Sequence, residues 1–432
     1  MCWCSSSSTW CQPMSRSGPS MNPSSDTPAI STIFRMADHA TPRERPAAGT
    51  ARAAVILAGV KTEDAQTEDA QTEDAQTEDA NTVLFHTDGR TGVVTLNRPR
   101  ALNALTHPMV IRIDEALAAW ADDPAVHQVL IRGAGERGLC AGGDIRAIHD
   151  DAKAGNTASA GFWRDEYRLN ARIARYPKPY VALMDGITMG GGVGVSAHGS
   201  VRIVTERSRV AMPETGIGFV PDVGGTYLLG RAPGELGTHL ALTGTAVGAA
   251  DALLCGLADH FVPADRLPEL TAALAGAPAH EVLPRYAAAP GPGELADRRG
   301  WIDRCYAAAT VEEIVERLLG QGEPAAKEAA GTILAKSPTA LKVTLAALRR
   351  AAGLGPLERV LAQEFRVSCN ALGAPDLVEG IRAQVVDKDR SPRWSPATLA
   401  EVTGADVECF FAPLGEDREL RLPPPPEDLS RG

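Results

Sequence analysis

The feature that most constrains the fold is a regular alternation of short apolar runs with helical patterns between residues 83 and 212. Two strands joined by a tight turn are expected at 83–86 and 93–96, because Asp88-Gly89 separates two Val-containing runs. Apolar residues recur at helical spacing from Thr106 to about Trp120. Further strands are predicted at 129–131, 179–184, 203–204 and 210–212, and further helices after Asp144 and over 163–174. Strands and helices that alternate in this way are typical of parallel βα units, so we expect an α/β fold.

By composition the chain divides into four parts. Residues 1–81 join a Ser- and Pro-rich stretch to four acidic pentads, Thr-Glu-Asp-Ala followed by Gln or Asn. Such sequence buries too little apolar surface to offset its ordering entropy, which predicts a disordered leader and linker. We expect the α/β core over 82–265, a helical C-terminal region over 266–400 and a tail over 401–432. Within the helical region, helices are predicted at 269–275, 311–319, 325–335 and 338–351.

Charge and cysteine usage narrow the classes of function. The net charge of −11 includes eight acids of the pentad repeat, and without them it would be −3. No basic stripe with interleaved aromatics indicates a nucleic-acid partner. No apolar run approaches the roughly 20 residues that span a membrane. The eight cysteines include no C-x₂-C pair, so we expect reduced thiols, no metal and a cytoplasmic location, with an organelle matrix as the alternative.

Several common catalytic motifs do not occur in the sequence. It has no Gly-Lys-Ser/Thr phosphate loop, no Gly-x-Ser-x-Gly elbow and no His-Glu-x-x-His pair. The glycine run at 190–194 has valine where a dinucleotide fingerprint needs its last glycine. The sequence therefore contains no motif that indicates a nucleotide cofactor or a zinc centre.

Two glycine-rich breaks each follow a predicted strand and precede a predicted helix. They are Cys140-Ala141-Gly142-Gly143-Asp144 and Thr188-Met189-Gly190-Gly191-Gly192. Backbone N–H groups at a helix start have no intrahelical partner and lie at the positive end of the helix dipole. Two such ends brought together would offer two donors to one oxygen, which is what an oxyanion hole requires. The alternative is that each cluster is only a tight turn.

These breaks, together with the sequence around them, resemble the crotonase (enoyl-CoA hydratase/isomerase) superfamily. The matching stretches are Leu-Asn-Arg-Pro at 96–99, Ala-Leu-Asn-Ala-Leu at 101–105, Cys-Ala-Gly-Gly-Asp at 140–144 and the triplet at 190–192. Residues 180–194, 212–225, 240–244 and 387–394 look like those of 3-hydroxyisobutyryl-CoA hydrolases. The resemblance covers about 83–400. It implies a crotonase-type spiral of ββα units with a C-terminal helical region.

The resemblance also implies roles for individual residues. The thioester oxygen would be held by the N–H of Gly191 and a second N–H at Ala141 or Gly142. Glu214 would be the catalytic carboxylate, acting on the carbonyl directly or through water. Asp222 would be its partner, holding the water or the substrate hydroxyl. Glu166 matches a residue that contacts the polar end of the substrate.

The residues themselves leave alternatives open for these acids. Glu214 lies between an apolar run and a Gly/Pro-rich loop, where partial desolvation would raise its pKa toward the range useful for proton transfer. It would otherwise be an acid near a helix start, beside Pro213. Asp222, before Val-Gly-Gly, would otherwise be a turn or cap residue. Glu166 would otherwise belong to a solvated helix face.

One departure from the superfamily pattern separates hydrolysis from hydration. Crotonase-type hydratases use two carboxylates, one of them two residues after the glycine triplet, and that position here is Gly194. A missing acid or base removes a contribution usually worth about 10²–10⁴ in rate. The resemblance therefore favours hydrolysis of 3-hydroxyisobutyryl-CoA in valine breakdown, with 3-hydroxypropionyl-CoA as a further substrate. The alternatives are an enoyl-CoA hydratase/isomerase and a non-catalytic acyl-CoA-binding protein.

Coenzyme A itself is polyanionic. Arg98, Arg100 and Lys388 lie in segments that the family uses around the nucleotide, although each would serve equally as a solvated surface charge. The resemblance implies no cofactor. Members of the family often form trimers, which makes a homo-oligomer one expectation. The alternative is that the longer C-terminal region covers the site within one subunit.

Overall fold

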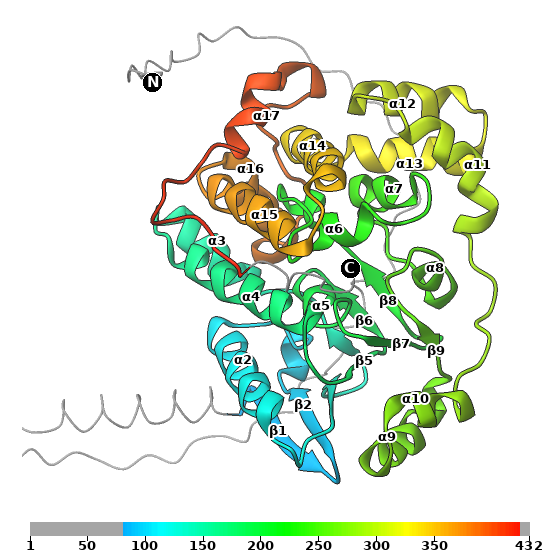
Figure 1. Ribbon diagram of the computed structural model, residues 1–432. Coiled ribbons are helices and arrows are strands. Elements are labelled where there is room, and N and C mark those ends of the chain that lie inside the picture. Colours follow the sequence, from blue (N-terminus) through cyan, green and yellow to red (C-terminus); the bar gives the residue numbers. More distant parts are fainter. Residues whose placement is uncertain (1–80, 424–432) are drawn as a thin grey trace, which may run out of the picture. The chain divides into compact units, whose positions relative to one another are not determined.

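The computed structural model describes residues 81–423, and its strands form two sheets (Figure 1). The larger sheet has the order β1-β2-β3-β5-β7-β9, and the smaller has the order β4-β6-β8. The strands are β1 (Val83–Asp88), β2 (Thr91–Leu96), β3 (Gln128–Gly133), β4 (Gly138–Cys140), β5 (Tyr180–Met184), β6 (Ile187–Met189), β7 (Val201–Val204), β8 (Arg209–Ala211) and β9 (His260–Phe261).

Successive strands alternate between the two sheets. β3, β5 and β7 enter the larger sheet, while the strand that follows each of them, β4, β6 or β8, enters the smaller one. Only the β1–β2 hairpin is antiparallel among the strand pairs within residues 81–423. Each turn of the chain thus contributes one strand to each sheet, which is the spiral of ββα units that was expected. The α/β fold prediction is confirmed.

The helices between residues 107 and 282 cover the sheets and connect the strands. The apolar side of α9 (Leu267–Gly276) packs on Leu130, Val181 and Ile203 of the larger sheet. These helices are α2 (His107–Asp122), α3 (Ile145–Lys153), α4 (Ala158–Ala174), α5 (Gly191–Gly194), α6 (Gly225–Leu229), α7 (Leu236–Thr243), α8 (Ala249–Leu254), α9 (Leu267–Gly276) and α10 (Ala279–Val282), with short 3-10 turns η1 (Pro99–Ala101), η2 (Glu214–Ile217), η3 (Ala264–Arg266) and η4 (Leu283–Arg285).

The C-terminal region is helical, as predicted, and contains more helices than the sequence pattern indicated. The predictions at 269–275, 311–319, 325–335 and 338–351 correspond to α9, α12, α13 and α14, whereas α11, α15, α16 and α17 were not anticipated. The elements are α11 (Leu295–Tyr306), α12 (Val311–Gly320), α13 (Pro324–Leu334), α14 (Pro338–Leu354), α15 (Leu357–Ala371), α16 (Pro375–Ile381), η5 (Arg382–Val386), η6 (Leu399–Glu401) and α17 (Gly404–Phe410).

The segment after residue 400 is folded and does not form the expected tail up to residue 423. Val402 and Val407 are buried, and α17 packs against α14 and α15. Leu414 and Leu420 are also buried, so apolar burial holds this segment on the helical region. The predicted leader and acidic repeat, and the Pro424–Pro426 part of the proline run, lie outside the described residues.

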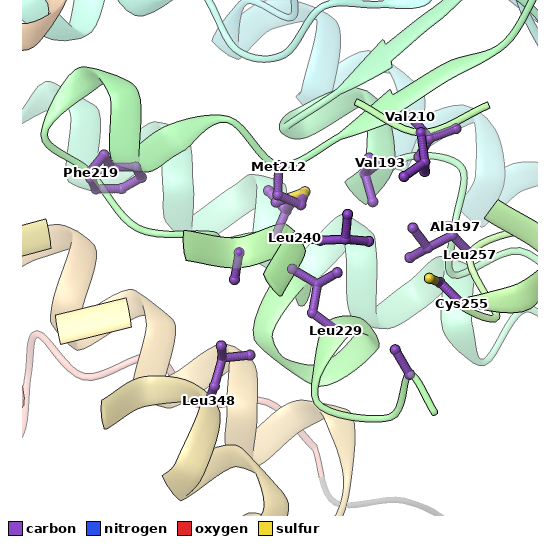
Figure 2. Close-up of a cluster of buried hydrophobic side chains, with 14 of the residues drawn as sticks. Val193, Ala197, Val210, Met212, Phe219, Leu229, Leu240, Cys255, Leu257 and Leu348 are labelled. Atoms are coloured by element: carbon purple, nitrogen blue, oxygen red, sulfur yellow. The ribbon is translucent and has the colours of Figure 1, made fainter. Parts of the chain in front are cut away.

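A cluster of buried apolar side chains joins α5 and β8 to the helices beyond them (Figure 2). Val193 of α5 and Met212, just after β8, lie among Leu229, Leu240 and Leu348, which come from α6, α7 and α14. Burying one such side chain contributes about 1.5–3 kcal/mol to folding. The glycine turn before α5 and the segment that leads from β8 to Glu214 therefore rest on a rigid base.

Candidate active site

The two glycine-rich turns lie against each other. They follow β4 and β6, which are parallel neighbours in the smaller sheet, so both turns emerge at the same edge. A Cβ placed on Gly191 would lie 3.3 Å from the Gly143 nitrogen, and one placed on Gly142 would lie 3.8 Å from the Gly191 nitrogen. Gly142 and Gly190 have positive φ angles of 117° and 51°, which L side chains rarely adopt. Glycine is thus needed both for the backbone conformation and for the close approach.

The backbone donors at this junction differ in part from those expected. Gly191 is the first residue of α5, so its N–H has no intrahelical partner. The N–H of Ala141 donates to the Leu102 carbonyl at 3.0 Å and is therefore not available to a substrate, which corrects the prediction. The N–H of Gly142 faces only the Cys140 sulfur, at 3.4 Å. Within residues 81–423 the N–H of Gly143 makes no hydrogen bond, which makes it the best placed second donor.

Glu214 is buried beside the Gly190 turn. It begins η2 directly after Pro213, and its carboxylate oxygen Oε1 would lie 2.9 Å from a Cβ on Gly190. The other oxygen, Oε2, is buried and has no hydrogen-bond partner in the described part of the chain. Burial raises the pKa of this carboxyl well above its ordinary value, and the charge of Asp222 raises it further.

Asp222 ends the loop that starts at Glu214. Phe219, within the loop, stacks on Trp163 of α4 with ring centroids 5.3 Å apart. The Tyr167 hydroxyl donates to Asp222 Oδ2 at 2.8 Å. Burial raises the pKa of Asp222 from 3.8 to about 7, while the Tyr167 hydrogen bond opposes that rise. A carboxyl that titrates near neutral pH suits proton transfer.

Glu166 faces the site from α4. Only 2% of the residue is exposed, which rules out the solvated helix face that was its alternative. Its oxygen Oε1 would lie 2.6 Å from a Cβ on Gly191 and has no partner within residues 81–423. Burial and the Asp222 charge both raise its pKa. The structure thus brings Glu166, Glu214 and Asp222 together around the Gly190-Gly191 turn.

Within residues 81–423, no ion pair neutralises these three carboxylates. None of the ion pairs formed among the described residues involves Glu166, Glu214 or Asp222. Like charges held close in a desolvated site disfavour full ionisation, so burial and the neighbouring acids raise the pKa values of these carboxyls together. Such a cluster can accept and return protons during a reaction.

Gly194 is the position at which the resemblance expects the second carboxylate of a hydratase, and no space remains there for a side chain. A Cβ on Gly194 would lie 2.8 Å from Val223 Cβ and 2.9 Å from Asn170 Nδ2. Real Cβ atoms essentially never come so close. The missing side chain is therefore built into the packing of α5.

Comparison with known proteins agrees with this geometry. Residues 91–411 match the model of the Enoyl-CoA hydratase/isomerase family. The chain belongs to this family.

Members of the family that resemble the chain carry two kinds of name. The 3-hydroxyisobutyryl-CoA hydrolase, mitochondrial, of Danio rerio is 45% identical over 351 residues, covering 79% of this chain and 91% of that protein. The protein of the same name from Homo sapiens is 44% identical and covers 77% and 89%. A solved carnitinyl-CoA dehydratase from Mycobacterium thermoresistibile is 56% identical with a TM-score of 0.76, covering 79% of this chain and 98% of that one. An enoyl-CoA hydratase structure from Rhodobacter sphaeroides 2.4.1 is 46% identical, with a TM-score of 0.75 and coverage of 79% and 100%.

The basic residues expected around coenzyme A fall into two groups in this family member. Arg98 is engaged within the protein, donating to the Ala104 carbonyl at 2.6 Å and pairing with Asp144 at 3.1 Å. It therefore braces the turn that carries Gly143. Arg100 and Lys388 are exposed, and η5, just before Lys388, contacts α3, which starts two residues after Gly143. Lys388 thus lies in a segment that reaches the same side of the molecule.

The sequence patterns missed three side chains that support the site. Tyr167 follows Glu166 and bonds Asp222, while Glu364 and Ser368 come from α15, which had not been expected. No motif marks the two α15 residues, because they meet Asp222 and its neighbours only in the folded chain. Within residues 81–423, no helix is both long and apolar enough to cross a membrane, and no group of acidic, His and Cys side chains could hold a metal ion.

Proposed function

We propose that this chain hydrolyses the thioester of 3-hydroxyisobutyryl-CoA to the free hydroxy acid and coenzyme A, a step of valine breakdown, and that it also cleaves 3-hydroxypropionyl-CoA. The observation that carries the proposal is the convergence of two unpaired N–H groups with the Glu214 and Asp222 carboxyls. The names of the Danio rerio and Homo sapiens relatives support the same substrate. Acyl-CoA is thus the expected partner, with no metal or cofactor taking part.

The residues divide the work as follows. The N–H groups of Gly191 and Gly143 stabilise the negative charge that develops on the thioester oxygen, and losing one such donor typically costs about 10²–10³ in rate. Glu214 attacks the carbonyl carbon itself or removes a proton from the attacking water. Asp222 holds that water or the substrate hydroxyl. The C–S bond breaks, the thiolate leaves as coenzyme A, and one water is consumed.

Hydration of an enoyl-CoA is the second candidate, since the solved relatives are named for hydration and dehydration. It would need a second carboxylate near Gly194, where Val223 and Asn170 occupy the space. The carboxylate of Glu166 is the group nearest to a Cβ on Gly191, and it reaches the turn from α4. The packing around Gly194 therefore favours hydrolysis.

Two substrates separate the candidates. Free thiol is expected from 3-hydroxyisobutyryl-CoA, with no loss of enoyl absorbance from crotonyl-CoA. The opposite result would support hydration. The absence of both signals would support a protein that binds acyl-CoA without turnover.

Glu214→Gln tests the central role directly. We expect at least a 10²-fold loss of kcat with coenzyme A binding retained, because amide nitrogen neither attacks nor accepts a proton. Glu235→Gln is the control, since Glu235 pairs with Arg349 elsewhere in the fold. Activity retained in Glu214→Gln would remove Glu214 from the mechanism.

We further infer a reducing cytoplasmic or organelle-matrix location. The five cysteines within residues 81–423 are all free, and burial raises the pKa of the Cys140 thiol to about 12, which makes it inert. The Danio rerio and Homo sapiens relatives are named as mitochondrial. Assembly into a homo-oligomer is a separate prediction, checked by light scattering.

A further inference from the structure

Two side chains of helix α15, one helical turn apart, hydrogen-bond to the Asp222 loop or to the tyrosine that contacts it. Glu364 and Ser368 are four residues apart and so face the same side of α15. Both are buried, with 1% and 0% exposed. Neither side chain takes part in the proposed reaction. Burying a polar side chain costs free energy unless it is hydrogen-bonded, so the hydrogen bonds of these two residues show what they do.

Glu364 holds the backbone immediately after Asp222. Its carboxylate accepts from the Gly224 N–H at 2.6 Å, the Thr226 N–H at 2.9 Å and the Thr226 hydroxyl at 2.5 Å. Gly224 has a φ of 80° and is the N-cap residue just before α6, so the loop makes a sharp turn at this point. Glu364 therefore fixes the direction in which the chain leaves Asp222.

Ser368 acts on the Asp222 side chain through Tyr167. The Tyr167 hydroxyl lies 2.8 Å from Ser368 Oγ and 2.8 Å from Asp222 Oδ2. Tyr167 has a single proton, and Asp222 in its ionised form can only accept. Ser368 must then donate to Tyr167, which leaves the Tyr167 proton pointing at Asp222.

We propose that Tyr167 is a positioning residue for the hydrolysis, oriented by Ser368 of α15 so that its hydroxyl fixes Asp222 and favours the ionised carboxylate. This inference rests on the proposed function of Asp222. It assigns the C-terminal helical region a direct part in the active site of its own chain.

The surroundings of Asp222 make this hydrogen bond influential. Besides Tyr167, the titratable side chains around Asp222 within residues 81–423 include three carboxyls that interact with it and one buried imidazole that bonds the next residue. These groups are Glu166 on α4, Glu214 on η2, Glu364 on α15 and His198, which bonds the Val223 carbonyl and has its pKa lowered by burial to about 4. The Tyr167 hydroxyl is the side chain whose hydrogen bond opposes the rise in the Asp222 pKa that burial causes.

The test compares pH profiles of kcat/KM for the full-length chain and three variants. In Tyr167→Phe the acid limb is expected to move up by about one to two pH units, the shift that a hydrogen bond to a charged group supports. Activity should recover to within a few-fold of the parent at high pH. Ser368→Ala should shift the limb in the same direction by less, since Tyr167 is then only disoriented.

Tyr306→Phe is the matched control. Its hydroxyl is also buried and bonds a side chain, His239, at 2.8 Å, on helices away from Asp222. It should lose stability without moving the acid limb. An unchanged limb in Tyr167→Phe, or in Ser368→Ala if Tyr167→Phe does not fold, would overturn the proposal.

A second measurement separates this proposal from the proposed function. An infrared titration of the Asp222 carboxyl band, assigned with Asp222→Asn, follows the carboxyl without any turnover. A higher midpoint in Tyr167→Phe supports the positioning role even if the parent chain releases no thiol. If the parent chain hydrolyses its substrate but Tyr167→Phe has the same midpoint as the parent, the positioning role is refuted and the proposed function is not.

Discussion

Replacing Asp222 by asparagine is expected to stabilise the fold at pH 8 while abolishing hydrolysis. Burial raises the pKa of Asp222 from 3.8 to about 7. Between these values the folded protein keeps a proton that the unfolded chain has released, so stability is greatest below about pH 4 and falls as pH rises toward 7. Asparagine removes this pH-dependent penalty because it does not ionise.

The size of the effect follows from the shift. A difference of about three pKa units corresponds to about 4 kcal/mol of unfavourable free energy above pH 7. Burying the new amide N–H₂ without a matching acceptor costs about 1–3 kcal/mol. Asp222→Asn should therefore be about 1–3 kcal/mol more stable than the parent at pH 8. At pH 4 the parent carries no penalty, so the order should reverse.

Urea unfolding at pH 4 and pH 8 measures both differences by linear extrapolation. Asp259→Asn provides a control of opposite sign. Burial acts to raise the Asp259 pKa, but hydrogen bonds from Arg202 lower it overall, so this variant should lose stability at pH 8. A stability difference for Asp222→Asn that is the same at both pH values would refute the reasoning. If the expected result is obtained, the parent chain gives up stability at pH 8 in order to keep the carboxylate that its activity requires.

Two further predictions concern the oxyanion hole and coenzyme A. Gly191→Ala should lower kcat by about 10²–10³, because its Cβ would lie 2.6 Å from Glu166 Oε1 and 3.3 Å from the Gly143 nitrogen; thiol-release kinetics measure it, and unchanged kcat would exclude this turn from the site. Lys388→Ala should raise KM several-fold at low salt with kcat preserved, because one charge near the polyanionic substrate is lost. The exposed Lys327 of α13 is the control, and equal KM values for Lys388→Ala and Lys327→Ala would remove Lys388 from the coenzyme A contacts.

Sequence patterns were sufficient for the elements that obey simple periodicities. The hairpin before residue 97, the buried strands and α2 all follow from apolar spacing and turn residues. The assignment of strands to two sheets does not follow from spacing, because β4, β6 and β8 have only three residues each, and of these only β8 was expected, at 210–212. Family resemblance supplied what periodicity did not.

Helix α15 shows why the C-terminal half was harder to predict. It is buried on several sides, with Glu358, Gln363, Glu364 and Ser368 inside as well as its apolar residues. Polar residues that face an active site break the apolar stripe by which an amphipathic helix is identified. The same reason hides Glu364 and Ser368 as functional candidates.

The identity of the second oxyanion donor illustrates a finer limit. The Cys-Ala-Gly-Gly-Asp motif contains several N–H groups, and which one stays unpaired depends on the segment that packs against the motif. Here the Leu102 carbonyl takes the N–H of Ala141, and Gly143 is left facing Gly191. Sequence gives the motif, while the pairing decides which nitrogen serves.

The contact between Tyr167 and Ser368 joins positions 201 residues apart in the chain. At ribosomal rates of about 5–20 residues per second, roughly 10–40 seconds separate the synthesis of the two residues. A nascent chain would carry the glycine turns and Glu214 long before α15 emerges to orient Asp222. The enzyme would therefore become catalytically competent only near the end of its own translation. A product terminated before residue 357 would lack α15, so its Asp222 would not be oriented for cleavage of a bound acyl-CoA.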